Sequence, residues 1–206
     1  MTDGADFGAD LRRVAPDADH DVLDGLWAEL VAAHDEPHRR YHTLQHARLV
    51  RDDAVVLAGA AGVDEPVLAV AAWYHDAVYD GRPGEDEAES AELAAGALDR
   101  LGRGELGDRV RSLILTTVDH RPADGGAAVL VDADLAVLAA APVHYERYRR
   151  RVRAEYAHVP DDAWRRGRAA VLRSLLGRDR LFHSPGGRGR EGSARRNLLT
   201  ELARVS

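Results

Sequence analysis

The sequence of 206 residues contains no cysteine and no lysine, so all 28 of its basic residues are arginines. Without cysteine, the chain has no thiol nucleophile, disulfide, iron–sulfur cluster or thiolate zinc site. Without lysine, it has no amine for Schiff-base chemistry or for a Walker-type phosphate loop. The chemistry that remains depends on histidine, carboxylate, hydroxyl and guanidinium groups.

Long apolar runs and aromatic side chains are also scarce. The longest apolar run, Val67–Tyr74, is far too short to span a bilayer, and aromatic residues make up 5% of the chain. The first ten residues are acidic and contain no apolar segment typical of a signal peptide. A net charge of −7 disfavours non-specific binding to the phosphates of duplex nucleic acid. We therefore expect a cytoplasmic protein that binds neither a membrane nor duplex nucleic acid.

Apolar residues recur at helical spacing along almost the whole chain. Leu23, Leu26 and Leu30, for example, follow one another at three- and four-residue steps. Segments rich in proline or glycine separate such stretches, and no alternating strand pattern bounded by hairpin turns is visible. The sequence predicts an all-α fold with one domain over residues 1–206. Helices are expected over about residues 23–30, 43–59, 64–76, 86–101, 105–118, 127–140, 143–157, 161–176 and 193–203.

Two of these helices carry recognisable boundary signals. Asp64, Glu65 and Pro66 are typical of a first helical turn, and Ser193 is a suitable N-cap for the last helix. The segment that follows Pro66, VLAVAAWYHD, is apolar on all sides. We expect it to form the buried centre of the fold.

Polar residues with the chemistry of metal ligands interrupt these apolar helices at three places. His42 and His46 are four residues apart, a spacing that puts both imidazoles on one face of a helix start. His75 and Asp76 end the most apolar segment, and two acids lie in the apolar segment Val129–Leu135. Each feature alone has a simpler explanation, such as a surface pair or a helix cap. Their combination predicts a mixed histidine and aspartate metal site, because a cation would satisfy polar groups that are costly to bury.

The ordered set of His46, the doublet His75-Asp76 and a distant Asp134 resembles the HD superfamily of metal-dependent phosphohydrolases. It is most similar to a bacterial branch that is described only as predicted phosphohydrolases of that superfamily. The branch has segments of the form PHRxYHTxxH, AAWxHDAVYD, a Ser-Ala pair after acidic residues, DADLxxL, RxEY and ARxNLxxEL. Here they correspond to Pro37–His46, Ala71–Asp80, Glu87–Ala91, Asp132–Leu138, Arg153–Tyr156 and Ala194–Leu202.

The resemblance implies an all-helical HD fold with one or two divalent metal ions per chain. The ligands would be His46, His75, Asp76 and Asp134, and Asp76 would also hold the attacking water. His42 matches a histidine that protonates the leaving oxygen in cyclic-nucleotide phosphodiesterases. The identity of the metal stays open among Mn, Zn, Ni, Fe, Co and Mg, since a site of this kind accepts several of them.

The choice between the two acids of the DAD segment also depends partly on this resemblance. The setting of Asp134 matches the last aspartate of the superfamily better than that of Asp132. Two residues along a helix correspond to a turn of roughly 200°, so both acids cannot easily face one ion. We therefore predict Asp134 as the ligand.

The residue types also fit hydrolysis of a phosphoester on chemical grounds. A divalent ion lowers the pKa of bound water and polarises a phosphoryl oxygen, so no protein nucleophile is needed. Negative charge on the phosphoryl group calls for cations, and Arg39, Arg40 and Arg153 are the nearest candidates by motif. The expected partner is a small-molecule phosphoester, with a nucleotide as the preferred kind. The roles of Asp80, Glu87 and His120 and the oligomeric state stay open.

Two other functions are compatible with the sequence. The chain could be a non-catalytic module that binds a nucleotide or metabolite and keeps a structural metal. It could also be a di-iron oxygenase on an HD-like fold, although such a centre needs more histidine and carboxylate ligands than the four predicted here. A pure binding module has no need of a proton donor such as His42, and this favours the enzyme.

Overall fold

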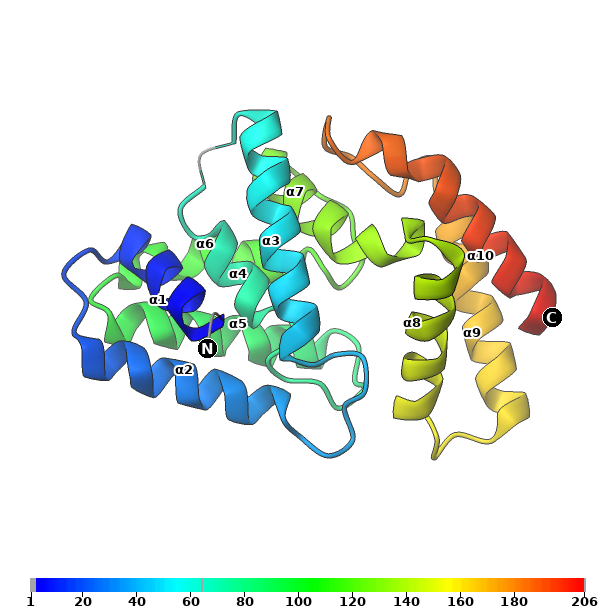
Figure 1. Cartoon of the computed structure of the whole chain (residues 1–206), viewed down its shortest axis with the longest axis horizontal. Helices are drawn as coiled ribbons and strands as arrows, with labels where there is room; N and C mark the ends of the chain where they lie inside the picture. The colour runs from blue at the N-terminus through cyan, green and yellow to red at the C-terminus, as the bar shows by residue number, and fades with distance from the viewer. Residues whose placement is uncertain (1–2, 64, 206) are drawn as a thin grey trace.

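The computed structural model describes residues 3–63 and 65–205, and it is built from α-helices joined by turns and short 3₁₀ segments (Figure 1). No strand occurs among the described residues, so the predicted all-α fold is confirmed. The helices are α1 (Asp3–Val14), α2 (His20–His34), α3 (Leu44–Ala61), α4 (Leu68–Tyr74), α5 (Glu85–Arg100), α6 (Gly107–Leu115), α7 (Gly125–Asp134), α8 (Pro142–Glu155), α9 (Asp161–Leu176) and α10 (Glu191–Val205). The 3₁₀ segments are η1 (Gly104–Leu106), η2 (Leu135–Ala139) and η3 (Arg188–Arg190).

Helix α4 lies at the centre of the first part of the chain. All seven of its residues are buried, as the absence of a polar face predicts. It packs against α1, α3, α5, α6 and α7, and the aromatic rings of Phe7, Trp27 and Trp73 meet at its side. The expectation that this segment forms the buried centre is confirmed.

A second hydrophobic cluster is formed by η2, α8, α9, α10 and the turn before α10, with Phe182 and Leu172 fully buried in it. In Figure 1 these helices stand on one side of the molecule and α1, α2, α4, α5 and α6 on the other. Helix α7 contributes to both clusters, since Leu130 packs in the first and Val131 in the second. This explains why α7 is apolar nearly all round. The single domain over residues 1–206 stays a prediction.

The ends of several helices differ from the expected ones. Helix α1 was not expected, although Phe7, Leu11 and Val14 have helical spacing and are buried. The last helix begins at Glu191, so the prediction of Ser193 as its N-cap is wrong. The helix expected over 64–76 covers only Leu68–Tyr74, and Asp64 lies outside the described residues.

Two further segments are interrupted, and a third begins later than expected. The helix expected over 105–118 is split into η1 and α6, and the one over 127–140 into α7 and η2. The helix expected over 43–59 begins at Leu44, so His42, which was expected to share a helix face with His46, lies outside the helix. The reason is that a carboxylate from α8, described below, binds the backbone N–H groups of residues 40–42.

Within the described residues, no single helix is both long and apolar enough to cross a membrane. The consecutive segments Gly125–Ala139 and Pro142–Glu155 meet that criterion only when taken together, and they are bent by 104° at the break between them.

A buried ion pair between Asp10 of α1 and Arg51 of α3 allows the packing of α1 on this core to be tested. Asp10 is 2% exposed and accepts hydrogen bonds from the Arg51 guanidinium and from Trp73 Nε1–H. Asp10→Ala leaves both donors without their partner, so the free energy of unfolding should fall by about 3–5 kcal/mol. Glu29→Ala removes an exposed ion pair with Arg100 and should cost less than about 1 kcal/mol. Urea unfolding measures both, and equal costs would contradict a structural role for Asp10.

Candidate metal centre

Three helix ends deliver histidine and aspartate side chains to one point. His46 lies in the first turn of α3, His75 directly follows α4, and Asp134 is the last residue of α7. Helices α4 and α7 are the most apolar segments of the chain, and both end where their polar residues meet. The imidazoles of His46 and His75 are 6% and 1% exposed, so water screens them very little.

The ligand atoms of these three side chains lie within 4.8 Å of one another, close enough to hold a metal ion. The Nε2 atoms of His46 and His75 are 3.2 Å apart. Asp134 Oδ1 lies 3.2 Å from the first of them and 3.6 Å from the second. Ligands bound to one ion at about 2.0–2.2 Å are separated by about 3 Å or slightly more. The three atoms therefore have the spacing of neighbouring corners in a coordination shell.

Asp76, the other predicted ligand, borders the same two imidazoles. Its Oδ2 atom lies 3.3 Å from His46 Nε2 and 3.1 Å from His75 Nε2. The group of three ligands that are all close to one another does not include Asp76. Of the four predicted ligands, the structure thus brings three into one group and places the fourth beside the two histidines.

The orientation of the His75 ring is set by the backbone of the preceding helix. Its Nδ1 lies 2.9 Å from the carbonyl oxygen of Ala72, so Nδ1–H donates and Nε2 faces the site. A hydrogen bond of this kind fixes the tautomer that a metal ligand needs. The local fold therefore prepares His75 to donate its Nε2 lone pair to a cation.

The pKa shifts show how strongly these charges depend on one another. Burial lowers the pKa of His75, but the charge of Asp76 and hydrogen bonds to Asp134 and Asp76 outweigh burial and hold it well above its usual range. Burial raises the pKa of Asp134, but hydrogen bonds from His120, His46 and His75 outweigh it and hold that pKa well below its usual range. Burial also raises the pKa of Asp76, but the charge of His75 and hydrogen bonds from His46 and His75 outweigh it and hold that pKa well below its usual range. Two partly buried carboxylates that stay ionised make a site that favours cations.

We call His46, His75 and Asp134 the metal group, and His120 makes a further contact with it. Its Nε2 lies 2.9 Å from Asp134 Oδ2, on the other side of the carboxylate from His46. Among the described residues, His120 is the only one other than glycine with a positive φ, at 52°. An L-residue adopts this conformation at a cost of about 1–2 kcal/mol, and such strain concentrates at functional sites. The sequence left the role of His120 open, and the structure places this residue in contact with the Asp134 carboxylate.

His42 lies beside the metal group and is held by Glu155, which sequence reasoning missed. His42 Nδ1 is 2.8 Å from Glu155 Oε2, while Glu155 Oε1 accepts the backbone N–H groups of residues 40, 41 and 42. Tyr79 stacks on the His42 ring with centroids 3.9 Å apart. Among the described residues no hydrogen bond is made by His42 Nε2, so this atom is available to the cavity. The RxEY motif contained the signal for Glu155, because it lies two residues after Arg153.

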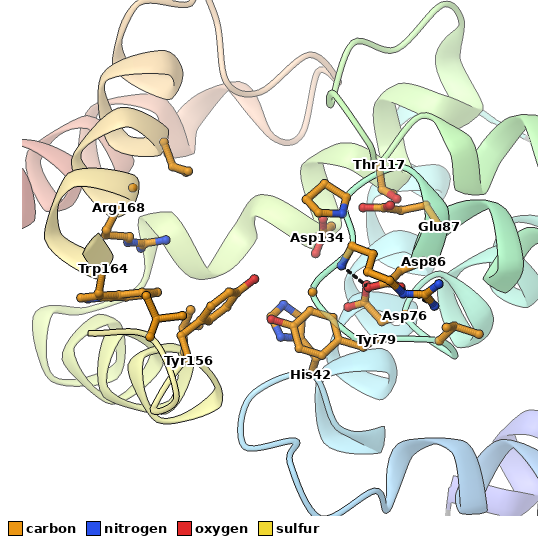
Figure 2. A pocket seen from close by; sticks show the side chains of 18 of the residues that line it. His42, Asp76, Tyr79, Asp86, Glu87, Thr117, Asp134, Tyr156, Trp164 and Arg168 are labelled. Atoms are coloured by element: carbon orange, nitrogen blue, oxygen red, sulfur yellow. Dashed lines mark hydrogen bonds and ion pairs between the residues drawn. The ribbon is translucent and has the colours of Figure 1, made fainter. Parts of the chain in front are cut away.

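A cavity of about 560 Å³ opens beside the metal group (Figure 2). His42, Asp76 and Asp134 lie on one of its sides. Tyr156, at the end of α8, and Trp164, on α9, face them from the opposite side, as Figure 2 shows. The metal group is therefore reached through a cleft with a polar side and an aromatic side.

None of the three arginines predicted to bind substrate lines this cavity. Arg39 is buried and donates to Glu36 and to the carbonyl oxygens of residues 42, 76 and 77. The side chain of Arg40 donates to backbone carbonyls of its own loop, and that of Arg153 to Asp161 and two carbonyls. Arg39 instead binds two backbone carbonyls of the turn that follows α4.

The arginines that do line the cavity, Arg82 and Arg168, were not predicted. Arg82 pairs with carboxylates on its own loop and on α5, among them Asp80 and Asp86. Arg168 forms a buried, bidentate pair with Glu201 on α10. Both charges are therefore already neutralised by neighbouring carboxylates.

The two acids of the DAD segment point to different places, as the helical geometry predicts. Asp132 is fully buried, and its oxygens accept the backbone N–H groups of His183 and Ser184. Gly187 packs so closely against this carboxylate that a Cβ there would lie 2.1 Å from Asp132 Oδ2. Asp132 thus holds the turn before α10, whereas Asp134 joins the metal group.

The remaining open residues have local contacts. Asp80 is an exposed partner of Arg82. Glu87 accepts the backbone N–H of Gly84 at the start of α5. Asp86, one residue earlier, accepts the N–H groups of residues 80 and 82 and so shapes the loop at the rim of the cavity.

Comparisons of the chain with protein-family models, curated proteins and solved structures found no match.

The different positions of Asp132 and Asp134 predict different effects when each is replaced by asparagine. Asp134→Asn removes an anionic ligand and should abolish tight binding of a divalent metal, measured as bound metal after dialysis. Asp132→Asn weakens the carboxylate contacts to the turn at 183–184 and should lower the melting temperature while the metal stays bound. If Asp132→Asn loses the metal and Asp134→Asn retains it, the assignment is wrong.

The lowered pKa of the Glu155 carboxylate also predicts that the stability of the protein depends on pH. Burial raises its pKa, but the hydrogen bond from His42, the charge of His42 and the backbone N–H groups outweigh burial and lower it from 4.5 to about 2. This corresponds to at most about 3 kcal/mol of stability, present above pH 4.5 and lost as the pH falls towards 2.

Glu155→Gln should therefore cost about 1–3 kcal/mol of unfolding free energy at pH 7, and the difference from wild type should shrink at pH 3. Glu146, on the same helix, provides a matched control. Hydrogen bonds from Arg149 also lower its pKa to about 2, but this ion pair is more exposed than Glu155, with about a quarter of each side chain open to solvent. Glu146→Gln should cost less than about 1 kcal/mol. A cost for Glu155→Gln that does not change with pH would contradict the role of its charge.

Proposed function

We propose that the chain is a metal-dependent phosphohydrolase of the HD superfamily that acts on a small-molecule phosphoester, with a nucleotide as the preferred class. The observation that supports it best is the position of His42. A potential proton donor with a free Nε2 lines the same cavity as Asp134 of the metal group and the neighbouring carboxylate of Asp76. A metal held only for structure does not need such a residue at its side.

The residues that would hold one or two divalent ions are His46, His75 and Asp134, with Asp76 beside them. When bound, a divalent ion supplies Lewis acidity that activates water and polarises a phosphoryl oxygen. The donor set of imidazole and carboxylate suits Mn, Zn, Ni, Fe, Co or Mg.

His42 acts in this proposal as the general acid for the leaving oxygen. Its Nδ1–H donates to Glu155, and this hydrogen bond fixes the orientation of the ring. The stacked Tyr79 ring and the bonds from Glu155 to the backbone restrict the position of the imidazole. The proton to be transferred lies on Nε2, the nitrogen that no described residue engages.

The aromatic side of the cavity would bind the organic part of the substrate. Tyr156 and Trp164 lie with ring centroids 5.2 Å apart, and Val78, Val152 and Val159 also line the cavity. A flat, apolar group such as a nucleobase stacks favourably on such rings. This is the reason for preferring a nucleotide as substrate. The proposal also includes a cytoplasmic location, with no binding to a membrane or to duplex nucleic acid.

A leaving-group comparison tests this proposal. The purified protein is first assayed with each divalent metal against nucleotides, alkyl phosphoesters and nitrophenyl phosphoesters. His42→Ala should keep its metal and its melting temperature, while turnover of alkyl and nucleotide esters falls by roughly 10²–10⁴. The loss should be much smaller for nitrophenyl esters, because nitrophenolate leaves without a proton.

His144, an exposed histidine on α8, provides the control, and His144→Ala should leave both rates unchanged. An equal loss for good and poor leaving groups would contradict an acid role for His42. If the wild type turns over no phosphoester with any metal, the binding module with a structural metal becomes the better hypothesis. A redox-active iron pair in the purified protein would favour the oxygenase.

A further inference from the structure

A second cavity, of about 640 Å³, is lined by four arginines and by His120, the residue that contacts Asp134 of the metal group. We call it the arginine pocket and define it by Arg121, Arg178 and Arg180. His120, His183, Arg173 and Asp179 also line it. Basic side chains thus outnumber acidic ones here, in a chain whose net charge is −7.

The three defining arginines differ from most others of the chain in their partners. Within residues 3–63 and 65–205, the guanidinium groups of Arg121 and Arg180 make no hydrogen bond or ion pair. Arg178 makes only a 3.4 Å contact with the carbonyl oxygen of His120. In the first cavity, by contrast, every arginine is paired with carboxylates, as Arg168 is with Glu201.

The acidic groups nearby do not neutralise the pocket. Asp179 lines it without an ion pair, and Asp119 accepts the backbone N–H of Arg121 rather than its side chain. Burial, and after it the positive charge of Arg121, lowers the pKa of Arg178. The guanidinium groups of Arg121 and Arg178 are therefore close enough to repel each other, and an anion bound between them would remove that repulsion.

His120 connects the arginine pocket with the metal group. Its Nε2 contacts the Asp134 carboxylate, while its carbonyl faces Arg178. A smaller cavity of about 360 Å³ joins the two regions and is lined by His42, His120, Asp134 and Arg178. One bound molecule could therefore contact both the metal group and the arginines.

We propose that the arginine pocket binds a second phosphate or pyrophosphate group, carried by the same substrate whose reacting phosphate lies at the metal group. This deepens the proposed function and depends on it for the identity of the ligand. Arginine suits this role because its planar fork of donors matches phosphate oxygens and keeps its charge at all relevant pH values. The substrate would then bear phosphate groups at two separate positions or a chain of phosphates.

The first test measures anion binding without turnover. Inorganic pyrophosphate is titrated into the metal-loaded full-length protein by calorimetry, with wild type and the double variant Arg121→Gln/Arg180→Gln compared. Both side chains are exposed, so the fold should be retained. We expect pyrophosphate affinity to fall at least tenfold, since each arginine contributes charge-assisted hydrogen bonds.

A matched double variant controls for the change in net charge. Arg13 and Arg166 are exposed, and neither makes a side-chain hydrogen bond or ion pair with the described residues. Arg13→Gln/Arg166→Gln should change pyrophosphate affinity less than twofold. Equal weakening in both double variants, or no weakening in Arg121→Gln/Arg180→Gln, overturns the arginine pocket as an anion site whatever the protein hydrolyses.

The second test identifies the source of the phosphate. For substrates with a second phosphate group, Arg121→Gln/Arg180→Gln should raise KM about tenfold or more. For matched substrates with one phosphate, KM should change less than twofold. Pyrophosphate should compete with the larger substrates. If pyrophosphate binds through the arginines but activates or inhibits without competition, the ligand is a separate effector and the proposal is overturned. If the arginines bind pyrophosphate but no phosphoester is turned over, the proposed function fails and the anion site alone stands.

Discussion

The structure depends on one constraint, which is that ionised carboxylates and imidazoles are buried together between apolar helices. Each of these groups alone would cost several kcal/mol in such a place. The cost is reduced only when His75, Asp76 and Asp134 meet His46, as they do at hydrogen-bond distance. Helices α3, α4 and α7 therefore have to begin or end at one point, and the turns around that point open the cavity.

The loop before α3 is held to this point from two directions. Arg39 binds the carbonyls that follow α4, and Glu155 binds the N–H groups of residues 40–42 together with the His42 ring. Arg39 belongs to the first part of the chain, whereas Glu155 ends α8 in the second hydrophobic cluster. The position of His42 thus depends on how the two clusters pack, and a change at that boundary would act on the proposed proton donor.

The distribution of arginine charge divides the surroundings of the metal group into two regions. Arg82 and Arg168, at the first cavity, are paired with carboxylates, and this leaves an aromatic wall as its main binding feature. Arg121, Arg178 and Arg180 keep their charge available in the arginine pocket, which His120 also lines. A ligand with a flat group at one end and anionic groups at the other would match this arrangement.

The sequence by itself determined the all-α class and the buried centre at residues 68–74, because helical periodicity is a local signal. Costly buried polar groups predicted a mixed histidine and aspartate metal site, and a family resemblance supplied the ligand set, of which the structure brings His46, His75 and Asp134 together. It also separated Asp132 from Asp134 through the helical period, aided by a family resemblance. Only the tertiary structure decided that Glu155 holds the His42 ring and that Arg39 binds the backbone carbonyls that follow α4. These outcomes depend on contacts between residues more than 30 positions apart, such as Glu155 with residue 40. No spacing along one segment encodes such contacts, since the packing of separate helices creates them.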